Sequence, residues 1–371
     1  MTRTSLRAHT VLVGLTCLAA AACRGGEKSA TPAAGAGTAA ESAAAPAAAP
    51  SLAGAPAGTY LYASNERGNS VTVIDTRTDS VVKTIMAGQR PRGVRLMPGG
   101  RELVVAVSGS PIGGPGIDES KLPPADHSKD GIAVVDLATD SVRRLPGGID
   151  PENFDITPDG KFIYVSNEAA GIATALDAAD GKIVGTVKVG GEPEGVTVTP
   201  DGKQAWVTSE EKGTVTVIDI ANNKTLATIH VGKRPRSLVF TADGATAYVP
   251  AEVGGNVSVV NAKTFKVLKT IPVKTPGAKP MGSAISPDGQ FVYITTGRGA
   301  TVEVIDTKTN TIVASIPDGK RPWGVAVSPD GKTIYTANGP SNDVSVIDAA
   351  TRAVVKRIPV GDSPWGVALS K

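Results

Sequence analysis

Seven residues with varied binding chemistry each directly follow the proline that opens a recurring segment. In segment order they are Trp365, Arg92, Glu152, Glu194, Arg236, Met281 and Trp323. The surrounding pattern repeats, whereas these side chains differ in charge, size and polarity. Positions that match in every repeat build the fold, so a position that breaks the pattern is a candidate for function. We interpret these seven residues as a recognition site.

Two tryptophans and one arginine are the expected anchors of this site. Trp323, Trp365 and Arg92 occupy the position in three successive repeats, if the first and last repeats adjoin. Tryptophan and arginine are enriched at interaction hot spots, and a guanidinium group can stack on an indole ring. We expect them to bind a protein or a small-molecule ligand. The competing interpretation is that polar residues vary freely at a wet surface while the tryptophans only cap the core.

Two carboxylates in neighbouring repeats, Glu152 and Glu194, are the only pair that suggests a metal. Hard oxygen ligands of this type bind divalent cations, which would support metal-assisted, lactonase-like hydrolysis. More often such a pair is solvated or neutralised by arginine. The identity of any metal stays open, and this hydrolase is an alternative to a binding protein.

The histidines are too few for most catalytic or metal centres. The sequence has three, at positions 9, 127 and 230, which excludes a histidine cluster for copper or zinc. His127, perhaps with Met281, is the one candidate for axial haem ligation. We predict no cofactor and favour a protein that is not an enzyme. A quinone or haem accessory protein remains a second alternative.

The elements that must position the seven residues recur roughly every 42 residues, a period typical of propellers and related arrays. Each repeat contains a Pro-Asp-Gly turn or a near copy, as at 158–160, 200–202 and 329–331, and a Val-Ile-Asp-like run, as at 73–75 and 346–348. Period-two alternation between such turns predicts four short antiparallel strands in each repeat. Stacking these sheets radially covers their apolar faces.

The strand count predicts an all-β, seven-bladed β-propeller of four-stranded antiparallel blades. The first repeat begins at its second strand, near Thr59, and the last ends with a first strand at 365–370. The N- and C-terminal strands should therefore share one blade and close the ring, which hides their edges. The first strand of each blade lines the central channel, so the seven residues should ring its mouth.

Several motifs resemble a known family. Tyr-Ala-Ser-Asn (62–65), Tyr-Val-Ser-Asn (164–167) and Tyr-Thr-Ala-Asn (335–338), each followed by a Val-Ile-Asp-like strand and a Val-Gly-x-x-Pro-like turn, resemble YVTN-repeat propellers. Residues 236–244, 341–348 and 363–368 resemble the branch associated with pyrroloquinoline-quinone-dependent catabolism. The resemblance covers residues 58–371 and implies the propeller fold. It implies no settled activity.

One repeat carries a long insertion. Residues 108–131, rich in glycine and proline, stand where the other repeats have a loop of about six residues. In a propeller this loop lies on the face of the channel mouth. We expect it to fold over the mouth as a lid or to flank the ligand.

The first 57 residues differ from the repeats. Arg3 and Arg7, an apolar run at 10–22 and Cys23 predict a signal peptide (1–22) with a lipobox-like end and lipidation of Cys23. Ordinary cleavage after Ala22, giving a soluble exported protein, is the alternative. Residues 23–57, rich in alanine, proline and glycine, should be a disordered tether, followed by the propeller at 58–371. We expect a protein of the bacterial cell envelope that faces the periplasm or the cell surface.

Charge and composition narrow the partners. The chain has 38 Lys and Arg residues against 35 Asp and Glu residues. This near balance disfavours a broad polyanion-binding surface, so no nucleic acid is expected. We expect a monomer that contacts the membrane only through a lipidated N-terminus. A purely structural envelope protein, whose ring residues can change without consequence, is a third possibility.

Overall fold

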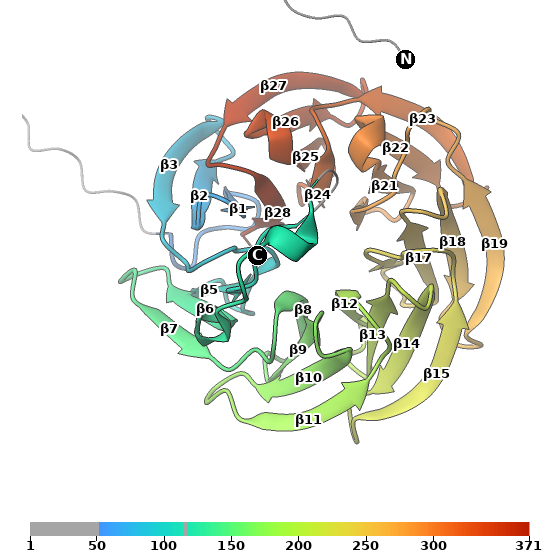
Figure 1. Cartoon of the computed structure of the whole chain (residues 1–371). Coiled ribbons are helices and arrows are strands. Elements are labelled where there is room, and N and C mark those ends of the chain that lie inside the picture. Colours follow the sequence, from blue (N-terminus) through green and yellow to red (C-terminus); the bar gives the residue numbers. More distant parts are fainter. Residues whose placement is uncertain (1–51, 114–116, 371) are drawn as a thin grey trace, which may run out of the picture. The chain divides into compact units, whose positions relative to one another are not determined.

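The computed structural model describes residues 52–113 and 117–370, and residues 50–371 form one compact unit (Figure 1). The expected signal peptide, the lipidation candidate Cys23 and the expected tether up to residue 51 lie outside the described residues. Within the described part, no helix has the length and apolar character needed to cross a membrane.

The propeller unit consists of seven four-stranded antiparallel sheets, which confirms the predicted fold (Figure 1). Blade 1 contains β28 (Pro364–Leu369), β1 (Tyr60–Asn65), β2 (Ser70–Asp75) and β3 (Ser80–Ile85). Blade 2 contains β4 (Val94–Leu96), β5 (Glu102–Val107), β6 (Gly131–Asp136) and β7 (Val142–Leu145). Blade 3 contains β8 (Pro151–Ile156), β9 (Phe162–Asn167), β10 (Ile172–Asp177) and β11 (Ile183–Lys188).

The remaining four blades follow the same order from the centre of the ring outward. Blade 4 contains β12 (Pro193–Val198), β13 (Gln204–Ser209), β14 (Thr214–Asp219) and β15 (Lys224–His230). Blade 5 contains β16 (Val239–Phe240), β17 (Thr246–Ala251), β18 (Asn256–Asn261) and β19 (Lys266–Pro272). Blade 6 contains β20 (Ser283–Ile285), β21 (Phe291–Thr295), β22 (Thr301–Asp306) and β23 (Thr311–Pro317). Blade 7 contains β24 (Pro322–Val327), β25 (Thr333–Asn338), β26 (Asp343–Asp348) and β27 (Ala353–Pro359).

The ring closes in blade 1, as expected. The C-terminal strand β28 pairs antiparallel with β1, with Leu61 opposite Leu369 and Tyr62 opposite Ala368. The inner strand of blade 1 thus comes from the end of the chain and its outer three strands from the beginning. Because β28 pairs with β1, the inward edge of β1 is not left unpaired.

The cores lie between neighbouring blades. The aromatic residues that recur in the second strand are buried, as the repeat pattern predicts: Tyr62, Tyr164, Trp206, Tyr248, Tyr293 and Tyr335 are at most 3% exposed. Val105 replaces the aromatic in blade 2 and is also buried. The aspartates that end the third strands cap the turns that follow, since Asp136 accepts hydrogen bonds from the N–H groups of Ala138 and Thr139.

Glycines on the inner strands allow the blades to meet around the channel. A Cβ on Gly195 would lie 2.5 Å from the carbonyl oxygen of Arg236 in the next blade, and one on Gly324 would lie 2.7 Å from that of Trp365. Any side chain there would force the inner strands apart. We therefore expect Gly195→Ala to lower the free energy of unfolding by a few kcal/mol, about the cost of overpacking.

The matched control for this change is Gly339→Ala. A Cβ on Gly339 would have its nearest neighbour at 3.6 Å, an ordinary contact. Urea unfolding followed by circular dichroism should show a lower midpoint for Gly195→Ala and little change for Gly339→Ala. Equal midpoints for the two variants would contradict this account of the inner strands.

Two details of the fold differ from expectation. Inner strands β4, β16 and β20 begin after Arg92, Arg236 and Met281 rather than at these residues. In blade 5 Pro250 of β17 contributes, because it has no N–H to donate to the inner strand. It is not a common cause, since β4 is also short although the equivalent Ala106 N–H donates to Gly93. The described residues also contain four 3-10 turns where no helix was expected: η1 (Glu119–Lys121), η2 (His127–Lys129), η3 (Gly297–Gly299) and η4 (Gly339–Ser341).

Residues 52–57 belong to the folded unit rather than to a free tether. Leu52 is 3% exposed and packs into the core between blades 1 and 2. The Gly54 N–H donates to the Gly100 carbonyl, and the Gly58 N–H donates to that of Ser370. Gly100 follows the end of β4, and Ser370 follows the end of β28. These ends of the inner strands lie on the opposite face of the propeller from the loops that precede the inner strands. The chain therefore enters the propeller on the face opposite the channel mouth.

Candidate functional site

Hydroxyl groups from neighbouring blades fix the backbone of the ring residues. The Ser64 hydroxyl donates to the Arg92 carbonyl at 2.6 Å, the Ser166 hydroxyl to the Glu194 carbonyl at 2.5 Å, and the Thr295 hydroxyl to the Trp323 carbonyl at 2.6 Å. Each donor lies near the end of a second strand in the preceding blade. The ring positions are therefore held by the blade interfaces rather than by flexible loops.

The residues just before the ring prolines adopt strained backbone conformations. Six of them have positive φ angles of 48–61°: Arg90, Asp150, Glu192, Arg234, Arg321 and Ser363. All six are non-glycine residues, for which a left-handed backbone costs on the order of 1 kcal/mol or more and is concentrated at functional sites. All six line one cavity. Strain repeated in six blades at one surface indicates that the side-chain directions there matter.

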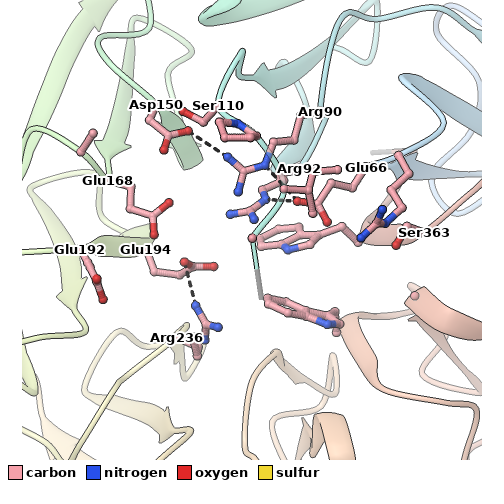
Figure 2. Close-up of a pocket in the computed structure, with 18 of the residues that line it drawn as sticks. Glu66, Arg90, Arg92, Ser110, Asp150, Glu168, Glu192, Glu194, Arg236 and Ser363 are labelled. Carbon is pink, nitrogen blue, oxygen red and sulfur yellow. Dashed lines mark hydrogen bonds and ion pairs between the residues drawn. The ribbon is translucent and has the colours of Figure 1, made fainter. Parts of the chain in front are cut away.

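The channel mouth is a cavity of about 1170 Å³. Its walls come from the loops before the inner strands and from those after the second strands, with Glu66, Glu168 and Glu192 among the lining residues (Figure 2). Of the seven ring residues, five line it: Arg92, Glu194, Arg236, Trp323 and Trp365. The structure therefore brings five of the seven predicted residues to one cavity.

Two of the seven ring residues do not lie where we expected them. Met281 is 2% exposed and lines a smaller cavity of about 90 Å³ in the channel, beside Arg236 and Trp323. Glu152 is fully buried, with an exposed fraction of 0%, beneath Arg90 and Arg92. Both are supports of the mouth rather than parts of its surface.

The two tryptophans form a stacked pair that is flanked by arginines. The ring centroids of Trp323 and Trp365 lie 5.4 Å apart with an interplanar angle of 36°. The Arg92 guanidinium lies 5.8 Å from the Trp365 ring, and those of Arg236 and Arg321 lie 5.1 and 5.0 Å from the Trp323 ring. Both indoles keep part of their surface exposed. The two tilted rings form a rigid aromatic platform at one side of the cavity.

An ion-pair cluster in blades 1 to 3 supports Arg92. Arg90 contacts Glu66 at 3.2 Å, Asp150 at 3.1 Å and Glu152 at 3.5 Å, and Arg92 contacts Glu66 at 2.6 Å and also pairs with Glu152. Figure 2 shows Arg90 and Arg92 between Asp150 and Glu66. The Arg90 side chain is only 6% exposed. This arginine is therefore a buried cation that neutralises carboxylates behind the platform.

A second cluster in blades 4 and 5 repeats this design. Arg236 contacts Glu194 at 3.0 Å and Glu252 at 2.8 Å and also pairs with Glu210. Glu210 pairs in addition with Arg234. Figure 2 shows Arg236 reaching up to Glu194. The two clusters thus place Arg92 beside Trp365 and Arg236 beside Trp323.

The two clusters shift carboxyl pKa values in opposite directions. Burial alone would raise the pKa of Glu66, but the guanidinium groups of Arg92 and Arg90 outweigh it and hold this pKa below its ordinary value. Burial, reinforced by the Glu194 carboxylate, raises the pKa of Glu210 to about 8 against the pull of Arg236 and Arg234. At Glu210, which has a second carboxylate nearby, desolvation has the larger effect on the pKa. At Glu66 the pairing with the arginines has the larger effect.

The pKa of Glu66 predicts how stability depends on pH. Because its pKa is lower in the folded protein than its ordinary value of 4.5, its contribution is complete above pH 4.5 and is lost as the pH falls through the folded value. We expect a Glu66→Gln variant to be less stable at pH 7 but to lose less stability between pH 5 and pH 3, roughly the range in which such a carboxylate titrates. Urea unfolding midpoints between pH 5 and pH 3 measure this difference in pH dependence, with Glu102→Gln as the control. Parallel curves of midpoint against pH for wild type and Glu66→Gln would disprove the prediction.

Several acidic residues of the site were missed from the sequence, and four of them share one position of the repeat. Glu66, Glu168, Glu210 and Glu252 each follow the end of a second strand, in blades 1, 3, 4 and 5. The sequence did contain a pattern that marks them. A glutamate directly follows the second-strand motif in four repeats: Tyr-Ala-Ser-Asn, Tyr-Val-Ser-Asn, Trp-Val-Thr-Ser and Tyr-Val-Pro-Ala. A glutamate that recurs at one position in four of seven repeats marks a ring of its own.

The expected metal pair does not face a shared site. Glu152 is paired with Arg90 and Arg92, and Glu194 is paired with Arg236. Among the described residues the only group with metal-ligand spacing is Asp150, Glu152 and Glu168, whose oxygen atoms lie within 4.8 Å of one another. Asp150 and Glu152 of this group already contact Arg90. Guanidinium groups thus occupy the place that the sequence suggested for a cation.

The insertion of blade 2 reaches the cavity. It spans the loop between β5 and β6, and Ser110, Pro111, Ile112, Gly113 and Leu122 line the mouth. Its base is fixed by Asp130, whose carboxylate accepts the N–H groups of Gly109 and Asp150 at 2.8 and 2.9 Å. His127 contacts the same carboxylate at 2.8 Å and is not among the cavity-lining residues. The insertion therefore flanks the mouth, as expected. Its histidine contacts a residue of the insertion itself rather than lining the cavity.

Comparisons with known proteins agree on the fold. A family model described as a lactonase, 7-bladed beta-propeller, matches residues 196–356. No curated protein matches the sequence. The match to the family model covers less than half of the chain, so it agrees with the seven-bladed propeller fold and assigns neither a family nor an activity.

Solved structures of differently named proteins share this architecture. A hydrazine synthase chain from Kuenenia stuttgartiensis is 26% identical with a TM-score of 0.68, covering 79% of this chain and 93% of that one. A Bacteroides fragilis protein for which a 6-phosphogluconolactonase activity has been suggested is 19% identical with a TM-score of 0.68, covering 84% and 98%. A dihydro-heme d1 dehydrogenase is 17% identical with a TM-score of 0.59, covering 86% and 77%. Such different names on one fold mean that function must be argued from the site.

Proposed function

We propose that this protein is a binding module whose ligand or partner docks in the channel mouth, on the platform of Trp323 and Trp365. The observation that carries the proposal is the partly exposed tryptophan pair, flanked by arginines and held in a cavity of about 1170 Å³. Rigid aromatic surface in a concave site is the usual core of an interaction hot spot. Arg92, Glu194 and Arg236 orient the platform, while Glu152 and Met281 support it from beneath.

The experiment for this proposal is affinity capture from the native cell envelope. Wild-type protein and a Trp323→Ala/Trp365→Ala variant serve as baits, and retained molecules are identified by mass spectrometry. A partner or ligand that is lost only with the variant supports a binding function at the mouth. Identical captures from both baits would remove the mouth as the site.

The context that we propose is the bacterial cell envelope, with export through residues 1–22 and lipidation of Cys23. The lipobox-like sequence supports this placement. The entry of the chain at Leu52, on the face opposite the cavity, is compatible with a tether that leaves the mouth open. We further propose that the protein is a monomer, makes no contact with nucleic acid, and belongs to the YVTN-repeat propellers related to quinone-dependent catabolism, as its motifs suggest.

A second candidate function is lactone hydrolysis, which the family model over residues 196–356 favours. The site offers Glu210, whose pKa is raised to about 8, as a group able to exchange protons near neutral pH. Hydrolysis of a simple lactone with and without added calcium or manganese tests this function. Turnover that disappears in Glu210→Gln would favour an enzyme; no turnover under any condition favours the binding module.

A further inference from the structure

We propose that the mouth takes an extended segment of a partner protein, which runs from the tryptophan pair to the junction with a neighbouring groove on blades 3 and 4 and carries a basic residue there. This inference rests on the binding function proposed above and adds the shape and charge of the occupant. Three observations support it: two connected cavities on the face of the mouth, the charged residues that line them, and carboxylates that form no ion pair.

The mouth cavity continues into a second hollow. This groove has a volume of about 620 Å³ and shares Glu192, Glu211 and Arg234 with the mouth. Its outer part is lined by His230, Lys233 and Val253, at the rim of blades 4 and 5. Sites for single small molecules measure about 300–1000 Å³, so the mouth alone exceeds this range. A wide cavity that continues into a groove fits an extended polypeptide segment, both ends of which extend beyond the cavity.

The charge at the junction of the mouth and the groove favours a basic side chain in the occupant, whereas Lys212 and Lys233 make the outer groove cationic. Eight carboxylate residues and six arginines line the mouth, and most of the arginines are already paired with carboxylates. Glu168, Glu192 and Glu211 make no ion pair with any other described residue. They lie on blades 3 and 4, where the mouth meets the groove, and Figure 2 shows Glu168 and Glu192 beside Glu194 on one side of the cavity. A polyanion would face this uncompensated charge.

One of these carboxylates lies against the backbone at the junction. The Glu211 carboxylate occupies the space next to Gly191 and is the free end of an exposed side chain. The residue after Gly191, Glu192, has a strained φ of 49°. The sequence thus accepts a left-handed glutamate where two unpaired carboxylates reach the junction.

The opposite end of the path supplies apolar contact. Trp323, Trp365, Pro111, Ile112 and Leu122 line the mouth away from the groove. An aromatic or branched side chain on the platform, followed by lysine or arginine near the junction, would match both ends. Extended chains joined in this way gain affinity from a few anchors rather than from the whole contact area.

The test uses a phage library of random short peptides, panned on the full-length protein after depletion on the Trp323→Ala/Trp365→Ala variant. We expect enrichment of peptides that combine an aromatic or branched residue with lysine or arginine. One enriched peptide is then synthesised and titrated. Replacing Glu192 by Gln should weaken it about two- to fivefold, as for a partly exposed ion pair. Changing Glu168, Glu192 and Glu211 together to Gln should weaken it about tenfold or more.

The control is Glu102→Gln, which removes a carboxylate paired with Arg143 outside the mouth and should leave the affinity unchanged. Enrichment of acidic peptides, no enrichment, or equal affinity for wild type and the triple variant would overturn the inference. Binding of spermidine without any peptide would also overturn it, in favour of a small-cation site. If the tryptophan variant loses its native ligand while the triple variant keeps it, the binding module stands and only this inference fails.

Discussion

Replacing both platform tryptophans, Trp323→Ala with Trp365→Ala, is expected to abolish binding at the mouth while the propeller stays folded. Each indole contributes flat, rigid surface next to an arginine, and truncating a central hot-spot tryptophan typically costs about 2–4 kcal/mol. The pair should therefore reduce affinity at least about a hundredfold. The amount of ligand retained on the immobilised protein measures the effect.

A matched variant separates ring stacking from mere bulk. Trp323→Phe with Trp365→Phe keeps a flat ring at both positions and should retain a large part of the binding. Trp206 provides an internal check of folding, because it is fully buried against Phe240 and far from solvent, so its fluorescence should be unchanged in both variants. Undiminished binding by the double alanine variant, with Trp206 still buried, would refute the role of the platform.

Loss of the buried arginine beneath the platform is expected to have the largest effect on stability. Arg90→Ala would leave Glu66, Asp150 and Glu152 without the cation that contacts all three. Removing one partner of a buried ion pair costs about 3–5 kcal/mol, because the remaining charge is not compensated. The free energy of unfolding in urea at pH 7 measures this loss.

The control for that prediction is Arg101→Ala. Arg101 also pairs with an aspartate, Asp136, but its side chain is 70% exposed, and such surface pairs contribute at most about 1 kcal/mol. A loss no larger than that of Arg101→Ala would show that the cluster does not support the mouth.

Repetition explains why the fold could be predicted so far from the sequence. Turn residues, alternation and the recurring aromatics at positions such as Tyr62 and Tyr164 are local signals, and each is repeated several times. Blade closure followed from simple order, because the chain begins at a second strand and ends at a first. One exception, the short β16, has a local contribution that a count of repeats does not weigh, the proline at 250 in β17.

The site was harder to predict because its geometry depends on neighbouring blades. Glu152 and Arg92 share one position of the repeat, yet Glu152 lies beneath Arg92, since the arginine needs a buried counter-charge. Glu66 and Glu210 belong to another strand end, and only the folded ring brings them beside Arg90 and Arg236. A pattern search finds which positions vary; it does not show which of them pair with one another.

Site-specific photo-crosslinking in intact cells tests the central claim most directly. A photoreactive amino acid would replace Arg67, an exposed residue that lines the mouth, and in a second strain Lys263, an exposed residue in a turn between third and fourth strands. We predict a discrete crosslinked species from position 67 that disappears when Trp323→Ala and Trp365→Ala are added, and none from position 263. No crosslink at 67, or the same species from both positions, would contradict a binding site at the channel mouth.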